Sequence, residues 1–270
     1  MMKRKDLKYL LSKGKAIIGT WCVMPSASVV NVIAATGLDF VIIDMEHGPH
    51  SFQTVEEMVR AAEVENCAAL VRVAKNDQTL ILNALDVGAQ GVVIPHIESK
   101  ADAESAVSFV KYPPLGTRGF SPFTRAGGYS FRNINNHSKL QNRRTMVILM
   151  LEGKGGIANI DDILSLENIR EKIDAIYIGA YDLSAAIGVP GKVDHPQVKR
   201  YLKMCIRKIR AKGIAAGGYV AKDGTDMGWM CDMGMRFITL LPDCTVLFGA
   251  YESLYRAFAR VLASRKKRRK

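Results

Sequence analysis

Six residues with ionisable side chains lie in, or within a few residues of, short apolar runs of this sequence. They are Asp44, Glu46, His47, Arg72, Glu152 and Asp182. An ionised group beside a buried strand costs free energy unless it is paired with an opposite charge or binds a metal. Acids, a histidine and an arginine that converge from different strands are therefore typical of a metal-dependent active site.

Glu152 ends the apolar run 146–152, and Asp182 directly follows the run 175–181. If these runs are neighbouring strands, the two carboxylates lie close together, and like charges at short distance need a cation or a retained proton. A hard divalent ion such as Mg²⁺ or Mn²⁺ fits oxygen ligands of this kind. The alternative is that each carboxylate caps the helix that follows it.

Asp44 and His47 lie three residues apart at the end of the run LDFVIID. A carboxylate can orient an imidazole ring and prepare it as a general base near neutral pH, so this pair is predicted to move protons. A structural role for His47 is the alternative. Arg72 lies inside the run ALVRV, where a buried guanidinium needs an anionic partner. We expect that partner to be Asp44, Glu46 or an oxygen atom of a substrate.

Other ionisable residues are weaker candidates. His96 lies near the end of a further apolar run. Its position fits contact with the site and a role in the core or a loop equally well. Asp86 lies late in a helical pattern, and a salt bridge at the rim of the fold is its competing interpretation. A Schiff-base mechanism needs a desolvated lysine. The lysines that follow strands are Lys75, Lys154 and Lys222, and none lies inside an apolar run.

The apolar runs are mostly continuous rather than alternating, which favours strands buried on both faces, as in a parallel sheet. The predicted strands are 16–22, 38–44, 68–73, 91–97, 146–152, 175–181, 215–220 and 237–242. Helical patterns lie between them, so we predict the α/β class and a TIM (β/α)₈ barrel. A doubly wound open sheet is the alternative, although no Gly-rich dinucleotide motif or Walker motif follows any strand.

The predicted helices include 52–65, 77–87, 101–110, 157–166, 196–212 and 245–263. Ser99 and Asp223 are predicted N-caps, and Gly213 is predicted to end the helix before it. Residues 112–145 form a long connection rich in Gly, Pro, Asn and Arg, and connections of this length are usually functional or disordered. Because this connection follows the fourth strand, we expect it to begin at the catalytic face as a lid or an interface segment.

The 270 residues are 48% hydrophobic and 24% charged, which favours one barrel domain over residues 1–263 and a basic tail at 264–270. The sequence has no membrane-spanning run and its basic start lacks signal-peptide features, so a cytoplasmic location is expected. The five cysteines form no C-x-x-C pair, which disfavours disulfides and zinc. The net charge of +12 is concentrated at the two ends of the chain, so nucleic acid is not the expected partner.

With these residues placed, the sequence resembles the HpcH/HpaI aldolase family of metal-dependent class II pyruvate aldolases, which act on compounds such as 2-keto-3-deoxy sugar acids. The resemblance extends from about Gly19 to Gly249. Its motifs are DFVIIDMEHGP (39–49), VRVAKND (71–77), LDVGAQGVVIPHIES (85–99), YPPLGTRG (112–119), LMLEG (149–153) and IGAYDLSAAIGVPGKVDHPQV (178–198). Together these motifs are specific, whereas no single one would suffice.

The resemblance implies a TIM barrel in a homo-oligomer, a trimer or a hexamer, often with the final helix exchanged onto a neighbouring subunit. The implied site has Glu152 and Asp182 as metal ligands, Arg72 on the pyruvate keto oxygen, Ala180 and Tyr181 at the substrate, His47 with Asp44 as the acid–base pair, and Glu46 and Asp86 as supporting acids.

These assignments predict a carbon–carbon lyase that cleaves or forms 4-hydroxy-2-oxo acids, with pyruvate and an aldehyde as the other reactants. The pyruvate enolate would be stabilised by Mg²⁺, Mn²⁺ or Co²⁺. Met150, Gly153 and Ala180 depart from the family pattern, which leaves open related enolate chemistry from oxaloacetate, by decarboxylation or by condensation with another carbonyl acceptor. A catalytically inactive barrel that binds partners through its basic ends is a further alternative, and the complete set of reactive residues argues against it.

Overall fold

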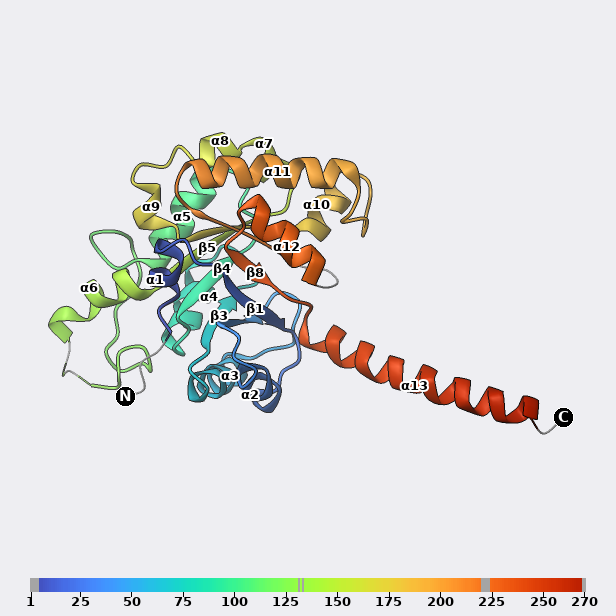
Figure 1. The fold of residues 1–270 in the computed structure, drawn as a ribbon. Helices are drawn as coiled ribbons and strands as arrows, with labels where there is room; N and C mark the ends of the chain where they lie inside the picture. The colour runs from blue at the N-terminus through green and yellow to red at the C-terminus, as the bar shows by residue number, and fades with distance from the viewer. Residues whose placement is uncertain (1–4, 131, 133, 220–223, 269–270) are drawn as a thin grey trace.

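The protein forms a closed barrel of eight parallel strands with helices packed around it (Figure 1). The computed structural model describes residues 5–130, 132, 134–219 and 224–268. The strands are β1 (Ile17–Cys22), β2 (Phe40–Asp44), β3 (Ala68–Arg72), β4 (Gly91–Ile94), β5 (Met146–Leu151), β6 (Ala175–Ile178), β7 (Ala215–Tyr219) and β8 (Phe237–Thr239). The sheet closes because Ile17 of β1 pairs in register with Phe237 of β8. The predicted TIM barrel is therefore confirmed, and the open doubly wound sheet is excluded.

Helices connect the strands. They are α1 (Leu7–Ser12), α2 (Ala27–Ala34), α3 (Phe52–Val64), α4 (Gln78–Asp86), α5 (Lys100–Val110), α6 (Ile134–Arg144), α7 (Lys154–Ala158), α8 (Ile160–Ile163), α9 (Ile169–Lys172), α10 (Ala180–Ala186), α11 (Pro196–Ala211), α12 (Gly224–Met233) and α13 (Asp243–Arg268). As predicted, Ser99 caps α5, and Gly213 follows α11 with a φ of +71°. The predicted cap Asp223 and the end of the predicted strand 215–220 lie outside the described residues.

Successive strand residues point to opposite faces of the sheet, so the barrel has two apolar cores. Phe40 belongs to the core inside the barrel, whereas its neighbour Val41 belongs to the core between strands and helices. Leu7 of α1 joins the inner core, and Lys8 lies 3.0 Å from Asp174, just before β6. Helix α1 therefore packs at the amino-terminal end of the strands, which leaves the carboxyl-terminal end for the site.

Several predicted boundaries differ from the structure. Three strands end three residues earlier than predicted: β4 at Ile94, β6 at Ile178 and β8 at Thr239. The predicted helix 157–166 is instead covered by the end of α7 and by α8, with Asn159 between them. Apolar residues beyond the strand ends remain buried, as Ile97 does, so hydrophobicity alone extended the predicted strands into the following loops.

The segment 112–145 begins at the amino-terminal end of the barrel, so the expected start at the catalytic face, as a lid, is wrong. The segment follows α5, and each helix of a (β/α)₈ barrel returns the chain to the amino ends of the strands. Arg118 lies 2.9 Å from Asp86 at the end of α4. Lys111 donates to the backbone oxygen of Thr145, just before β5. A role of this segment in an interface stays a prediction.

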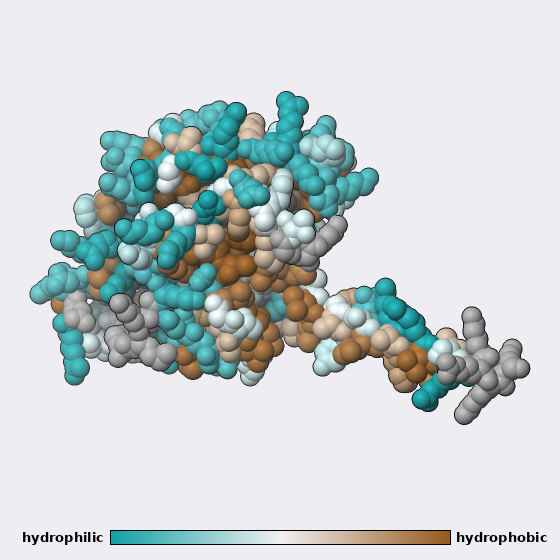
Figure 2. Space-filling view, in the orientation of Figure 1, coloured by the Kyte–Doolittle hydropathy of each residue, from teal (hydrophilic) through white to brown (hydrophobic). Residues whose placement is uncertain are grey.

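Helix α13 leaves the barrel after β8 and projects away from it (Figure 1). Hydrophobic residues cover much of its surface (Figure 2). The exposed ones are Val246, Leu247, Phe248, Tyr251, Leu254, Tyr255, Phe258, Val261 and Leu262. The helix runs to Arg268, so it continues across the predicted boundary between residues 1–263 and the basic tail. Within the described part of the chain, no helix combines the length and apolar character needed to cross a membrane.

Candidate active site

The carboxyl-terminal end of the barrel brings most of the predicted site residues together. Asp44 and Arg72 end β2 and β3 and are partners in register. Glu152 directly follows β5, and Asp182 lies in the first turn of α10. A cavity of about 770 Å³ opens at this end. Its walls include Asp44, His47, Arg72, Met150, Ala180, Tyr181 and Asp182.

Arg72 is buried and held by two acids. Its Nε donates to Asp44 Oδ1 at 2.8 Å, and its Nη2 donates to Asp44 Oδ2. Its Nη1 lies 3.0 Å from Glu46 Oε2. The two-point contact with Asp44 fixes the plane of the guanidinium. The hydrogen bonds to Asp44 occupy two of its five N–H donors, so others remain for a molecule in the cavity.

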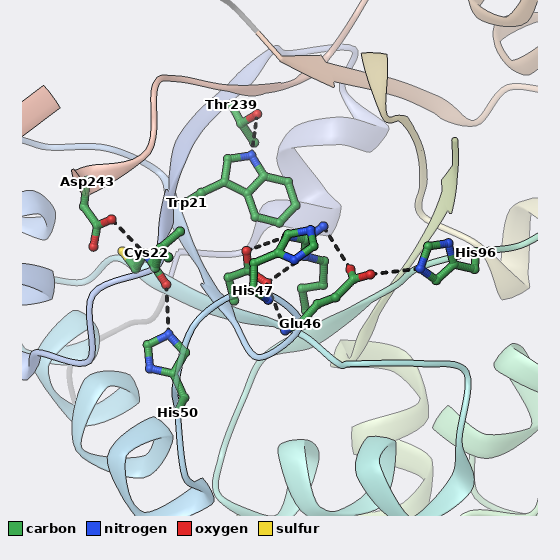
Figure 3. A network of polar contacts seen from close by, with 11 residues as sticks. Trp21, Cys22, Glu46, His47, His50, His96, Thr239 and Asp243 are labelled. Carbon is green, nitrogen blue, oxygen red and sulfur yellow. Dashed lines mark hydrogen bonds and ion pairs between the residues drawn. The ribbon is translucent and has the colours of Figure 1, made fainter. Parts of the chain in front are cut away.

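Trp21 covers the guanidinium and was not among the predicted site residues. The Arg72 Cζ lies 4.6 Å from the centre of the indole ring, close enough for a cation–π contact. The indole N–H donates to Thr239 Oγ1 at 3.0 Å (Figure 3), and the Tyr177 hydroxyl lies 2.8 Å from the same oxygen. In the sequence, Trp21 and Tyr177 are indistinguishable from core aromatics; only the closure of the barrel brings β1, β6 and β8 together around Arg72.

Asp44 does not orient the His47 ring. Besides Arg72, its carboxylate accepts hydrogen bonds from the backbone N–H groups of Glu46 and His47, at 3.1 and 3.3 Å. The His47 side chain is exposed on the cavity wall, and none of the described residues hydrogen-bonds to its ring. The predicted geometry, a carboxylate that holds the imidazole, is therefore wrong. A role of His47 in proton transfer stays a prediction.

The electrostatics of Asp44 agree with a structural partnership with Arg72. Burial by itself raises the pKa of Asp44, but the hydrogen bonds and charge of Arg72, together with two backbone N–H groups, outweigh it. The pKa of Asp44 is therefore lowered, and the carboxylate stays ionised next to the guanidinium.

His96 links the acid beside Arg72 to Glu152. Figure 3 shows its contact with Glu46. Its Nε2 lies 2.9 Å from Glu46 Oε1, and its Nδ1 lies 3.2 Å from Glu152 Oε1. Its backbone N–H donates to the same Glu152 oxygen at 3.0 Å. The backbone of His96 has a φ of +54°, a conformation uncommon for residues with a side chain. The sequence left a site role and a core role open for His96, and the structure places it at the site.

Glu152 is a buried carboxylate in an acidic neighbourhood. Burial raises its pKa to about 7, the contacts with His96 oppose this shift, and the charges of Asp182 and Glu46 add to it. Gly179 leaves room beside the carboxylate, since a Cβ at Gly179 would lie 2.9 Å from Glu152 Oε2. The site therefore has both the negative charge and the space that suit a cation.

Neither Glu152 nor Asp182 caps a helix, which removes the alternative interpretation of these carboxylates. Helix α7 begins after Gly153 and α10 after Gly179, and neither has a side-chain cap. Over residues 5–130, 132, 134–219 and 224–268, no cluster of three or more His, Cys, Asp or Glu side chains could hold a metal. The two-carboxylate set instead matches the way Mg²⁺ is usually bound, with substrate and water completing the coordination.

Asp86 lies outside the site of its own chain. It is the last residue of α4, at the amino-terminal end of the barrel, and pairs with Arg118 at 2.9 Å. The predicted supporting role of Asp86 in the site is therefore wrong within one chain. The structure confirms the competing interpretation, a salt bridge at the rim of the barrel.

Buried charges around a cavity at the carboxyl-terminal end of a (β/α)₈ barrel define the class of TIM-barrel enzymes. The family model of the HpcH/HpaI aldolase/citrate lyase family matches residues 18–248 of the chain. The chain therefore belongs to the HpcH/HpaI aldolase/citrate lyase family, as its motifs predicted.

Individual relatives agree with this family. The chain is 31% identical over 252 residues to the pyruvate aldolase of Rhizobium etli, across 93% of this chain and 96% of the relative. It is 32% identical to the 2-keto-3-deoxy-L-rhamnonate aldolase of Salmonella dublin, across 93% and 92% of the two chains. The crystal structure of an HpcH/HpaI aldolase/citrate lyase family protein from Burkholderia cenocepacia has a TM-score of 0.86 and 27% identity, covering 94% of this chain and 98% of that one. The protein is thus a carbon–carbon lyase of the aldolase type.

Proposed function

We propose that the protein cleaves or forms 4-hydroxy-2-oxo acids, with pyruvate and an aldehyde as the other reactants. The observation that carries this proposal is Arg72, whose guanidinium is fixed by Asp44, lies beside Glu46 and keeps N–H donors that Asp44 does not occupy. Donors fixed in this way stabilise a carbonyl oxygen that gains negative charge as a carbon–carbon bond breaks. The names of the relatives, pyruvate aldolase and 2-keto-3-deoxy-L-rhamnonate aldolase, support the same substrate class.

In the cleavage direction, the C3–C4 bond breaks and its electron pair remains on the pyruvate fragment as an enolate. The C4 hydroxyl loses its proton, and C4 becomes the aldehyde carbonyl. Arg72 donates hydrogen bonds to the C2 oxygen as charge develops on it. His47 on the cavity wall takes the hydroxyl proton, and C3 of the enolate is then protonated to give pyruvate. Aldol addition is the reverse sequence.

We assign Glu152 and Asp182 as the residues that hold a divalent cation, Mg²⁺, Mn²⁺ or Co²⁺. When bound, the cation would polarise the 2-oxo acid as a Lewis acid. The support for this assignment is the buried Glu152 carboxylate, the charge of Asp182 close to it and the space left by Gly179.

Chemistry that starts from oxaloacetate is a second candidate, and Met150 favours it. Met150 departs from the family pattern and lines the cavity, and its methyl carbon would lie 3.0 Å from a Cβ placed at Gly179. It therefore shapes the wall next to Glu152, where substrate binds in our proposal. Decarboxylation of oxaloacetate gives the same enolate but has no hydroxyl proton to remove, so the products separate the two candidates.

We also propose that α13 packs on a second copy of the chain in a homo-oligomer. Its aromatic residues are far more exposed than core residues, with 68% for Phe248 and 72% for Tyr255. Burying such a side chain contributes about 1.5–3 kcal/mol, so a helix with this surface is stabilised by a partner. Sedimentation of the full-length protein should show a trimer or a hexamer that Phe248→Asp weakens. A full-length chain that sediments as a monomer would contradict this assembly.

The proposed reaction is tested by a screen for pyruvate release from a set of 4-hydroxy-2-oxo acids, with and without EDTA. We expect release from at least one compound, loss of release in EDTA and recovery with Mg²⁺, Mn²⁺ or Co²⁺. If no 4-hydroxy-2-oxo acid is cleaved while oxaloacetate is consumed, the second candidate replaces the first.

A further inference from the structure

Thr239 is a polar residue in the largely apolar interior of the barrel. It ends β8 and is completely buried. Its hydroxyl oxygen lies 3.0 Å from the indole nitrogen of Trp21 and 2.8 Å from the hydroxyl oxygen of Tyr177 (Figure 3). The three side chains come from β8, β1 and β6 and are all at most 6% exposed. Burying polar groups costs free energy unless they bond to one another, so this contact is a single hydrogen-bonded unit.

One arrangement satisfies every polar group of this unit. A threonine hydroxyl has two lone pairs and one proton. In this arrangement the Thr239 oxygen accepts the indole N–H and the Tyr177 O–H, and it donates its own proton to the backbone oxygen of Gly218 at 3.5 Å. Burial raises the pKa of Tyr177 to about 12, so the phenol keeps its proton at neutral pH. The Trp21 ring is therefore held at its nitrogen by an oxygen that Tyr177 also holds.

The ring held in this way lies against the guanidinium of Arg72. The centre of the indole ring is 4.6 Å from Arg72 Cζ. The negative charges that act on the guanidinium are those of Asp44, Glu46 and Glu152. A neutral aromatic ring attracts a cation without adding another carboxylate, and it keeps water from the part of the guanidinium that it covers. The charge of Arg72 is therefore less screened where it acts on a molecule in the cavity.

We infer that Thr239 and Tyr177 are positioning residues, whose hydroxyl groups fix the Trp21 ring over Arg72 and thereby speed the formation of the enolate. The inference rests on the proposed function, in which Arg72 donates to the C2 oxygen as charge develops on it. Trp21 and Tyr177 line the cavity, whereas Thr239 is completely buried and does not. Thr239 therefore acts through the ring that it holds.

The first test removes the shared hydroxyl group. Thr239→Val keeps the shape of the side chain, and exchange of pyruvate methyl protons in D₂O, with Mg²⁺ and without an aldehyde, measures enolate formation. We expect kcat for exchange to fall by about tenfold, the size expected for one buried hydrogen bond. The KM for pyruvate should change little, because the lost effect acts on charge that develops in the transition state. Thr239→Ser should retain most of the rate.

A second variant tests the same unit without disturbing the bond to the indole nitrogen. Tyr177→Phe keeps the aromatic ring and removes only its hydroxyl group, so we expect a smaller fall in kcat than in Thr239→Val. It also keeps the inference open to refutation if Thr239→Val does not fold. Thr145→Val is the matched control, since Thr145 is also buried but lies just before β5, at the amino-terminal end of the barrel. It should leave the exchange unchanged.

A double-mutant cycle separates positioning of Arg72 from a general loss of structure. Arg72→Lys already lacks the planar donors that the Trp21 ring covers. If Thr239 acts through the guanidinium, adding Thr239→Val to Arg72→Lys should lower the remaining exchange by less than about twofold. The same tenfold loss in both backgrounds would overturn the inference.

The fluorescence of Trp21 gives a readout that needs no turnover. The sequence has two tryptophans, and Trp229 lies in α12, away from the cavity, so Trp229→Phe leaves Trp21 as the only emitter. In this background Thr239→Val should make the ring more accessible to quenching by acrylamide, because a buried N–H without a partner gains from contact with water. Thr239→Ser should restore the protection. Equal quenching with and without the Thr239 hydroxyl group would overturn the inference.

The wild-type protein separates this inference from the proposed function. If it exchanges pyruvate protons and Thr239→Val and Tyr177→Phe exchange them equally fast, only the positioning role fails. If the wild type neither exchanges pyruvate protons nor releases pyruvate from any 4-hydroxy-2-oxo acid, the proposed function fails and the positioning role fails with it.

Discussion

Replacing Asp44 with Asn tests whether this carboxylate serves Arg72 or His47. The side chains of Asp44 and Arg72 are only 3% and 7% exposed, and removing one partner of a buried ion pair typically costs 3–5 kcal/mol. Asn keeps the shape of the side chain, but only its one oxygen can accept, so the side-chain amide loses one of the two guanidinium N–H groups that now contact Asp44. Glu46 remains 3.0 Å from Nη1 and still compensates the guanidinium, so we expect the lower end of that range, about 3 kcal/mol.

Urea unfolding of both proteins across a range of pH measures this effect. The pKa of Asp44 is lowered in the folded protein, so its stabilisation is complete above the ordinary aspartate pKa of about 4 and is lost as the pH falls through the folded value. The advantage of the wild type over Asp44→Asn should therefore be largest near neutral pH and shrink below about pH 4. A difference under about 0.5 kcal/mol at neutral pH, or one that does not change with pH, would refute the reasoning.

Three further predictions concern Arg72, His47 and Lys111. Arg72→Lys keeps the charge but loses the planar donor set, so turnover should fall by about 100-fold or more while the protein stays folded; a variant that unfolds but is active in its folded fraction would make Arg72 structural. His47→Ala should reduce cleavage of 4-hydroxy-2-oxo acids much more than decarboxylation of oxaloacetate, and equal losses in the two assays would argue against a proton-transfer role. Burial lowers the pKa of Lys111 to about 8, so the folded protein binds fewer protons than the unfolded chain between about pH 8 and 10.5. Urea unfolding should therefore show the wild type gaining stability over Lys111→Met as the pH rises across that interval. A difference in stability that stays constant with pH would contradict the lowered pKa.

The barrel could be predicted because burial on both faces of a parallel strand leaves a continuous apolar run, and the sequence contains eight such runs. The ends of the strands could not be predicted, because a loop residue such as Ile97 is as buried as a strand residue. The position of 112–145 was predicted wrongly because the segment was related to the strand before it. It follows helix α5, which returns the chain to the other end of the barrel.

The charged residues of the site could be found because an ionised group in or just after an apolar run is costly without a partner. The contacts between these charged residues could not be predicted from the sequence. Asp44 and His47 are close in the sequence, yet Asp44 is paired in register with Arg72 on the next strand, and the guanidinium takes the carboxylate. Likewise, Trp21 is brought to Arg72 by the pairing of β1 and β3 with β2 between them, a contact between residues 51 positions apart that no local pattern contains.

The central claim is that Glu152 and Asp182 hold a cation beside Arg72 and thereby allow pyruvate to lose a methyl proton. Exchange of pyruvate methyl protons in D₂O, followed by NMR, tests this claim most directly. The exchange is measured first with Mn²⁺, then after EDTA has removed the metal, and finally after excess Mg²⁺ has been added. We predict exchange with the metal, none in EDTA, recovery with Mg²⁺, and no exchange in Glu152→Gln under any of these conditions. Exchange that continues undiminished in EDTA, with a lysine adduct trapped by borohydride and pyruvate, would contradict the account.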